Sequence, residues 1–482
     1  MTASRLLGLV LTGCLLAACV RNPVTGKRQL ALVSSEQEIA LGKQSAEEVR
    51  QTMGTYDDPK VKAYVSGVGM RMATASERPR IPWQFDVVDD PAVNAFALPG
   101  GPIFVTRGIL THLRSEAELA AVVGHEIGHV TARHSVQQLS KQQLAQVGLG
   151  LGVVLSPELG QLGQLASAGM QLLFLKYGRD DERQSDELGF RYMTAAGYDP
   201  REMPKVFEML AKASALSGGG RVPEWMSTHP DPENRAKKAA GRAAGVEGAD
   251  RMKVDEAGYL ALVDGMVFGD DPRQGFFEGQ TFKHPGLGFQ LAFPKGWKTE
   301  NGAAAVQGVS AEQDAAVQLS VVTGAASPEE AKQKFFAQEG IRPATTLSAE
   351  APRNAARFEA QTQQGALGGY VTFASAGKVT LQLVGFAPEA ALSKHDAELH
   401  AALASFGPLT DRAALDVKPA RVKLVKLDRD QTVAEFMAAH PSNADPKLLA
   451  LINGVDEGGR MKAGTLAKQV VGGPPAQAAR QP

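Results

Sequence analysis

One stretch, residues 115–134, constrains this chain more than any other. It reads SEAELAAVVGHEIGHVTARH. Ser115 is followed three residues later by Glu118, which is the pattern of a capping box, so a helix is expected to start here. Apolar residues recur at helical spacing on one face, and small residues lie on the opposite face. This pattern predicts a helix that is buried on both faces.

The same stretch contains His-Glu-x-x-His. His125 and His129 are four residues apart, so their imidazoles project from one side of the helix on successive turns. Two imidazoles in this arrangement can bind one Zn²⁺, and the intervening Glu126 can act as general base toward a water at the metal. Glu126 falls within the apolar stripe, where an ionised carboxylate is costly unless charges or hydrogen bonds compensate it. The pattern favours a zinc centre over two unrelated histidines.

The third metal ligand is expected downstream, in the acidic residues 179–200. On a helical wheel, Glu182 and Asp186 share a face with core residues and with Gly189, whereas Glu187 points away. A face that includes a glycine can lie close against the His helix. Glu182 is therefore the predicted third ligand, and Asp186 is predicted to orient a ligand imidazole or to assist proton transfer. The alternative is an acidic, solvated helix end.

His229 follows the glycine-rich residues 217–220 and precedes a helix. That helix is expected to begin with Asp231 as N-cap and Pro232 at its first position. Two interpretations stay open for His229. It either reaches the site as a fourth metal partner or oxyanion donor, or it is a loop histidine in solvent.

The N-terminus predicts export and a lipid anchor. Residues 6–18 form an apolar run after Arg5 that is too short for a comfortable transmembrane span. The run Leu16-Ala17-Ala18-Cys19 resembles the lipobox of bacterial lipoproteins. This resemblance implies a signal peptide at 1–18, cleavage before Cys19 and lipidation of its thiol and amine, and several acyl chains anchor a protein stably. Val20 in the next position implies sorting to the outer membrane.

Composition excludes some classes of protein. The formal net charge of −1 over 482 residues gives no argument for nucleic acid as a partner. The two cysteines, Cys14 and Cys19, both lie near the N-terminus, so the rest of the chain can form no disulfide.

The segments around the His helix follow helical and strand patterns. Ser35 and Glu38 predict a capped helix to about residue 53, and a second helix is expected over 59–75. Residues 83–87 alternate like a half-buried strand, and 94–110 read as strand, Gly-rich turn, strand and short helix. Whether the edge of that hairpin takes an extended peptide by β-augmentation or is an ordinary edge stays open.

Residues 135–178 contain two apolar runs, 147–155 and 162–175, each shorter than a membrane helix needs. They fit a packed helical hairpin. A mobile flap over the site, or a surface that touches membrane or unfolded clients, are the alternatives.

The fold class expected for the whole chain is α+β. A mainly helical, zincin-type domain with a small sheet is followed by an α+β domain with an antiparallel sheet and helices near 328–339 and 389–404. A small strand-helix-helix-strand unit comes last. The expected boundaries are 19–257 for the peptidase domain, 258–280 for a linker, 281–407 for the α+β domain, 418–472 for the small unit and 473–482 for a disordered tail.

His125-Glu126-x-x-His129 followed by Glu182-x-x-x-Asp186 resembles the gluzincin family of CAAX prenyl proteases and HtpX, and most of all its periplasmic BepA-type branch. NAFALPGG, AGYDP and the step around His229 look like that branch as well. The resemblance covers roughly residues 22–245. It implies one Zn²⁺ per chain, bound by the two histidines and Glu182, with Glu126 as general base and Asp186 as an assisting acid. It also implies that His229 can approach the metal.

The C-terminal half departs from that branch, because its tetratricopeptide repeats are not found here. Residues 281–407 look like a PsbP-type α/β sandwich, and 427–471 look like a divergent LysM module, which implies peptidoglycan as a partner of 418–472. The choice of client proteins therefore does not carry over.

These patterns predict a lipid-anchored periplasmic zinc endopeptidase, held at the inner leaflet of the outer membrane through Cys19. The family resemblance implies unfolded or misassembled envelope proteins as its substrates. Two other functions stay open: a chaperone-like outer-membrane assembly factor whose protease activity is latched or incidental, and a peptidoglycan-binding scaffold lipoprotein.

Overall fold

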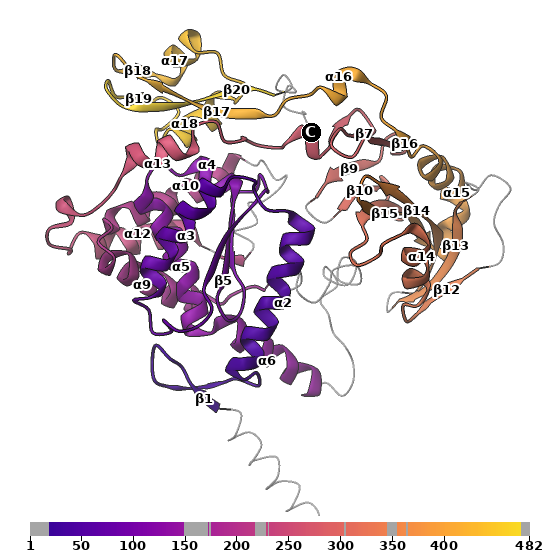
Figure 1. Cartoon of the computed structure of the whole chain (residues 1–482), viewed down its shortest axis with the longest axis horizontal. Coiled ribbons are helices and arrows are strands. Elements are labelled where there is room, and N and C mark those ends of the chain that lie inside the picture. Colours follow the sequence, from indigo (N-terminus) through magenta and orange to yellow (C-terminus); the bar gives the residue numbers. More distant parts are fainter. Residues whose placement is uncertain are drawn as a thin grey trace, which may run out of the picture. The chain divides into compact units, whose positions relative to one another are not determined.

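The computed structural model describes residues 19–148, 172, 175–216, 228–229, 231–302, 305–344, 354–362 and 365–473. The chain divides into two compact units. Residues up to 269 and residues 421–471 form the first unit, and residues 270–420 form the body of the second. The fold is α+β, as predicted: the N-terminal region is mainly helical with small sheets, and the second unit is rich in strands (Figure 1).

Helices of the first unit surround a three-stranded sheet in the order β3-β5-β4, in which β3 and β5 are parallel and β4 is antiparallel to β5. The predicted helices and the predicted hairpin are present, and a short hairpin, β1 and β2, precedes them. The elements are β1 Cys19–Arg21, β2 Arg28–Leu30, α2 Ser35–Met53, α3 Pro59–Ala73, β3 Gln84–Val88, β4 Ala95–Ala97, β5 Pro102–Thr106, α4 Arg107–His112, α5 Glu116–Ala132, α6 His134–Gly148, α9 Arg179–Ala195, α10 Met203–Leu216, α12 Pro232–Ala243 and α13 Glu256–Val263.

Helix α5 is the centre of this unit, and every one of its residues is buried. It packs against α3, α9 and α10 and against the strand β4. Its apolar side chains join one continuous core with those of the sheet and of the neighbouring helices. The expectation of a helix buried on both faces is confirmed.

The hairpin β1–β2 is attached to the C-terminal end of α5. Asn22, in the turn of the hairpin, donates from Nδ2 to the carbonyl of Ala132, 3.1 Å away. The backbone N–H of Leu32, just after β2, donates to Ser140 Oγ on α6 at 2.9 Å. The first described residues of the chain are therefore part of the packed unit.

Three capping expectations were wrong in detail. The N-cap of α2 is Ser34, with Gln37 completing the capping box, because Glu38 turns inward to pair with two buried arginines. Ser115 caps α5 as expected, but the Glu118 carboxylate accepts from the N–H of Arg114, one residue earlier than in a capping box. Asp231 stands at the N-cap of α12 in a left-handed conformation, and its side chain makes no capping hydrogen bond.

Residues 258–280, expected as a linker, contain most of α13. Tyr259 is fully buried there, and its hydroxyl donates to the carbonyl of Leu110 at 2.7 Å. This helix packs on α3 and α5, so it is part of the first unit's core. Only the part after residue 269 belongs to the second unit.

The second unit has two antiparallel sheets, a four-stranded one in the order β16-β8-β7-β6 and a seven-stranded one in the order β12-β13-β14-β15-β11-β10-β9. Helices α14 and α15 occupy the places predicted from the sequence. The elements are β6 Phe276–Glu278, β7 Thr281–His284, β8 Phe289–Ala292, β9 Lys298–Asn301, β10 Ala305–Val309, β11 Ala316–Val321, α14 Pro328–Phe336, β12 Ile341–Pro343, β13 Ala356–Thr362, β14 Gly365–Ala376, β15 Val379–Pro388, α15 Glu389–Ala404, β16 Gly407–Pro408 and α16 Arg412–Leu415.

The last part of the chain has the predicted order strand, helix, helix, strand. Strand β17 (Ala420–Lys426) pairs with β20 (Leu466–Gly472), and helices α17 (Val433–Ala439) and α18 (Pro446–Ile452) lie between them in sequence. Two short strands, β18 (Gln431–Thr432) and β19 (Arg460–Met461), form an additional ladder. Likeness to a LysM module stays a prediction.

Several expectations fall outside the described residues. They concern the signal peptide at 1–18, nearly all of the apolar runs 147–155 and 162–175, residues 217–220 and the tail. Leu172 and Leu175 are described, and both are buried beside side chains of α2 and β5. No helix in the described ranges has the length and apolar character needed to cross a bilayer.

Candidate metal centre

Four side chains that can bind a metal meet in the first unit. His125 and His129 come from α5, Glu182 comes from the first turn of α9, and His229 precedes α12. All four are buried, and one ligand atom from each lies within 4.8 Å of the others. The two residues of the His pair and the predicted third ligand are thus brought together, and His229 joins them.

The separations of these atoms fit a tetrahedral ion. His125 Nε2 lies 3.0 Å from His129 Nε2 and 3.3 Å from His229 Nδ1. Glu182 Oε1 lies 3.3 Å from His129 Nε2 and 2.8 Å from His229 Nδ1. Ligands that are 2.0–2.1 Å from a tetrahedral zinc lie about 3.3–3.4 Å from one another. The donor set, three imidazoles and one carboxylate, is also one that zinc takes.

The electrostatics of the cluster suit a cation. Burial lowers the pKa of His125 to about 3 and also lowers the pKa of His129, so both imidazoles are neutral and each has one unprotonated nitrogen. Burial alone would raise the pKa of Glu182, but His229 and His129 hold it well below its usual range. The carboxylate is therefore ionised inside a buried site, which a metal ion would neutralise.

Close contact of two helices brings Glu182 to the histidines. A Cβ atom at Gly189 on α9 would lie 2.8 Å from the backbone nitrogen of His125, and one at Gly128 on α5 would lie 3.0 Å from Cα of Ser185. Side chains at these positions would force the helices apart. The expectation that a glycine-bearing face of residues 179–200 packs against the His helix is confirmed.

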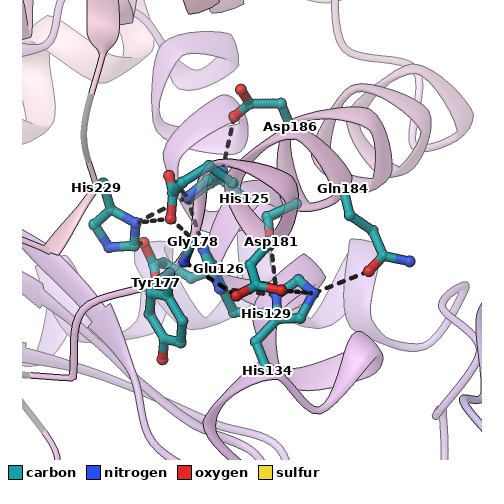
Figure 2. A network of polar contacts seen from close by, with 12 residues as sticks. His125, Glu126, His129, His134, Tyr177, Gly178, Asp181, Gln184, Asp186 and His229 are labelled. Carbon is teal, nitrogen blue, oxygen red and sulfur yellow. Dashed lines mark hydrogen bonds and ion pairs between the residues drawn. The ribbon is translucent and has the colours of Figure 1, made fainter. Parts of the chain in front are cut away.

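Asp186 and Arg235 fix the ring of His125. His125 Nδ1 lies 3.0 Å from Asp186 Oδ1, so it can donate there, which leaves Nε2 unprotonated and facing the cluster (Figure 2). Arg235, on α12, donates to both oxygens of Asp186, at 2.6 and 2.8 Å. Its Nη1 also lies 2.9 Å from Glu182 Oε2, and the guanidinium stacks over Phe207. One buried arginine therefore links two acidic residues of the site.

His134 and Gln184 fix the ring of His129. The side-chain oxygen of Gln184 accepts from His134 Nε2 at 2.9 Å (Figure 2). Burial lowers the pKa of His134 to about 4, so it carries one proton, which this bond places on Nε2. Its bare Nδ1 can then accept from His129 Nδ1, 3.0 Å away. His129 is left with the unprotonated Nε2 facing the cluster, which is the tautomer that binds a metal.

Glu126 lies beside the cluster, with its carboxylate near His229. Within the described part of the chain neither of its oxygens makes a hydrogen bond, and His229 Nε2 is 3.7 Å from Oε1. Burial and the negative charge of Glu182 raise the pKa of Glu126 well above its usual value. A buried carboxylate with a raised pKa is a strong proton acceptor.

Two further features lie beside the cluster. Strand β4 is an edge of the three-stranded sheet and packs on α5, so the predicted hairpin is present with one edge unpaired in that sheet. A small recess beside the cluster is lined by Ala121, Val122, His125, Met203, Val206 and Phe207. Apart from the histidine, its walls are apolar.

The sequence reasoning missed Arg235, His134, Gln184 and Tyr177, whose ring centroid lies 4.1 Å from that of His129. The position of Arg235 in the sequence could have indicated that it is buried. It falls on the same face of α12 as the buried Ala236 and Ala239, just as Glu126 falls within the apolar stripe of α5. Glu187, predicted to point away, is exposed and lies 3.7 Å from Arg242.

The region that contains the cluster is similar in sequence to known proteins. Residues 59–243 match the sequence model of peptidase family M48. The beta-barrel assembly-enhancing protease of Yersinia pestis is 31% identical over 261 residues, which are 50% of this chain and 53% of that protein. Its counterpart in Escherichia coli K12 is 30% identical over 46% of this chain and 47% of that protein. The mitochondrial metalloendopeptidase OMA1 of Arabidopsis thaliana is 39% identical over 35% of this chain and 33% of its own length.

The chain spans about half the length of the curated bacterial relatives that it matches. Among solved structures, cyanobacterial PsbP from Synechocystis is 10% identical with a TM-score of 0.21, covering 27% of this chain and 91% of that one. A score this low carries no argument, so the PsbP-type expectation for residues 281–407 stays a prediction.

Proposed function

We propose that the chain hydrolyses peptide bonds at one Zn²⁺ bound by His125, His129 and Glu182, and the match of residues 59–243 to peptidase family M48 supports this proposal. The observation that carries this proposal is the pairing of two features in one buried place. One is a ligand set with tetrahedral spacing, and the other is the buried carboxylate of Glu126 beside it, whose pKa is raised.

Zinc at this position supplies Lewis acidity toward the scissile carbonyl and toward water. Glu126 holds the attacking water, takes its proton, and passes that proton to the leaving amine. Asp186 and Arg235 keep His125 in one orientation, and His134 with Gln184 keeps His129 in the tautomer that binds metal. The edge of β4 is the proposed place for an extended substrate, and the apolar recess suits a small apolar side chain.

His229 has two proposed roles, and both follow from its position. With Nδ1 at 3.3 Å from His125 Nε2 it can fill the fourth ligand position and exclude water, which latches the enzyme off. Displaced from there, its imidazole can donate to the oxyanion that forms as the carbonyl is attacked.

The relatives named beta-barrel assembly-enhancing proteases support envelope proteins that fail to fold or assemble as the substrates. We place the chain in the periplasm, anchored at the outer membrane through a lipid on Cys19. The arrangement of His229 as a fourth ligand also supports a second candidate function. This is an assembly factor whose protease activity is latched until a client releases the histidine.

The central test replaces Glu126 by Gln, which keeps the size of the side chain but removes the base. Cleavage of an unfolded substrate should fall by roughly 10²–10⁴-fold or more, because proton transfer loses its acceptor. Bound zinc, measured by metal analysis, should stay at one per chain. Full proteolysis by the variant would rule out Glu126 as the base.

Two glutamates on α9 provide the control for the ligand set. Glu182→Ala should lose zinc on dialysis, because one of the metal's ligands is gone. Glu187→Ala should retain it, since this side chain is exposed and faces Arg242. Equal zinc retention in the two variants would refute the assignment of Glu182. If Glu126→Gln cells keep full envelope function, the assembly factor is favoured over the protease.

A further inference from the structure

Residues 421–471, here called the C-terminal module, group with the peptidase unit, although 151 residues of the second unit separate them in sequence (270–420). The module uses three of its elements, β17, α18 and β20, to contact α4, α10 and the segment after α13. Of these, α4 leads directly into α5, the helix with His125 and His129, and α10 packs on α5.

A buried lysine is the centre of this interface. Lys468, on β20, is fully buried, and its ammonium donates to the carbonyls of Thr111 and Leu113 at 2.8 and 2.5 Å. These carbonyls lie at the C-terminal end of α4, where the last carbonyls of a helix have no partner within the helix. A cation is favoured at that end of a helix. Lys468 therefore caps α4 two residues before the N-cap of α5.

The module holds this lysine in place from its own side. The N–H of Lys468 donates to Asn453 Oδ1 at 2.7 Å, and its carbonyl accepts from Asn453 Nδ2 at 2.9 Å. Arg114, between α4 and α5, donates to the carbonyl of Leu466 at 3.3 Å and pairs with Glu256 on α13. The junction between the two helices is thus bound by both β20 and α13.

Burying an ammonium is costly, and the burial lowers the pKa of Lys468 well below its usual value. An apolar side chain in its place would leave the carbonyls of Thr111 and Leu113 without this donor. The buried Lys468 side chain makes both of its hydrogen bonds only when the carbonyls of Thr111 and Leu113 are within reach. It therefore favours this one docked position of the module over other positions.

A second line of hydrogen bonds joins the module to the opposite end of α4. The N–H of Gly265 donates to the carbonyl of Val422, and the N–H of Val422 donates to Met266, at 2.8 and 2.9 Å. The same segment is held by Arg107, the first residue of α4, which donates to the carbonyls of Val267 and Gly269. Both ends of α4 are therefore tied to the module, directly or through one segment.

We infer that the C-terminal module is a structural subunit of the peptidase, which docks on α4 through Lys468 and fixes the start of the catalytic helix. Its partner is the N-terminal part of the same unit, residues up to 269. This role is independent of whether the chain cleaves peptides, because it concerns the folding and position of α5.

The inference is tested by cutting the full-length protein. A recognition sequence for a specific protease, inserted after the exposed Asp416, lets the chain be cleaved just before the module. The C-terminal fragment should co-elute with the rest on size exclusion at micromolar concentration. Lys468→Met should weaken this association on the order of 10²-fold, because two hydrogen bonds to a charged group are lost. The fragment should then elute separately.

Lys462→Met is the matched control. Lys462 lies on the same module, is exposed, and pairs with Asp430 within the module, so the fragment should remain bound. In the uncut protein, Lys468→Met should lower the midpoint of thermal unfolding by roughly 3–8 °C, and Lys462→Met should not change it. Dissociation of the unsubstituted fragment, or its binding to peptidoglycan in place of the peptidase, would overturn the inference. Equal behaviour of the two lysine variants would overturn it as well.

Discussion

At the scale of single residues, the site depends on which nitrogen of each histidine carries the proton. Asp186 sets this for His125, and the pair of His134 and Gln184 sets it for His129. His229 has a different environment, since its Nδ1 faces Glu182 and its Nε2 lies toward Glu126. Because the ring lies between Glu182 and Glu126, a small rotation would take it from one of its two proposed roles to the other.

His229→Ala separates the two roles proposed for this residue. The variant should keep its zinc, because three ligands remain. If the latch dominates, cleavage of an unfolded protein rises. If support of the oxyanion dominates, turnover falls by about 10²–10³-fold. If the variant cleaves the unfolded protein at the same rate as the unsubstituted protein at every pH between 6 and 8, His229 has no part in the chemistry.

At the scale of elements, the contact between α5 and α9 determines where Glu182 lies. Gly189 permits it, because its missing side chain leaves room for the backbone around His125. The acidic residues of α9 are otherwise ordinary helix residues, and their place in the site depends on this close packing.

Gly189→Ala should therefore push the two helices apart. A Cβ there would meet backbone atoms of Gly124 and His125 at 2.8–3.1 Å, which a helix cannot accommodate by side-chain rotation. We expect a loss of stability of about 1–3 kcal/mol, measured by urea unfolding, together with weaker zinc binding. Gly67→Ala on α3 is the control. Nothing lies within 4 Å of its added methyl, so it should be neutral or stabilising by up to about 1 kcal/mol.

Local patterns predicted the elements well and some of their ends less well. The helical spacing in residues 115–134 and the glycine in the face of residues 179–200 were sufficient to predict the packing of α5 on α9. The capping box at Ser35 was placed one residue late because Glu38 pairs with Arg78 and Arg133, far away in sequence.

The site residues that were missed share one cause. Arg235 and Gln184 act through contacts with residues on other elements, and no local spacing distinguishes them from surface residues of a helix. Lys468 is similar, since its partners lie more than 350 residues earlier. Long-range polar contacts of this kind are the part of the site that a single sequence does not predict.

At the scale of the whole molecule, the chain leaves the first unit after Gly269 and returns to it at Arg421. The second unit is thus an insertion in the sequence of the first. Its two antiparallel sheets form a core of their own.

The anchor is tested on the whole protein in cells. Cys19→Ala should move the protein from the membrane fraction to the soluble fraction after lysis, because the residue that would carry the lipid is gone. Incorporation of labelled fatty acid should disappear in parallel. A variant that stays in the membrane fraction without label would point to the apolar residues 147–175 as the contact instead.

The hairpin β1–β2 determines how far from a lipid on Cys19 the first unit would lie. Asn22 is bonded to the last residue of α5, and only two residues separate it from Cys19. Extended chain of that length spans about 10 Å. A lipid on Cys19 would therefore hold the first unit directly against the bilayer. The protein would then reach substrates only in the thin layer next to the membrane. Proteins free in the periplasm would be out of reach until they came to the membrane surface, and location would then select substrates before sequence does.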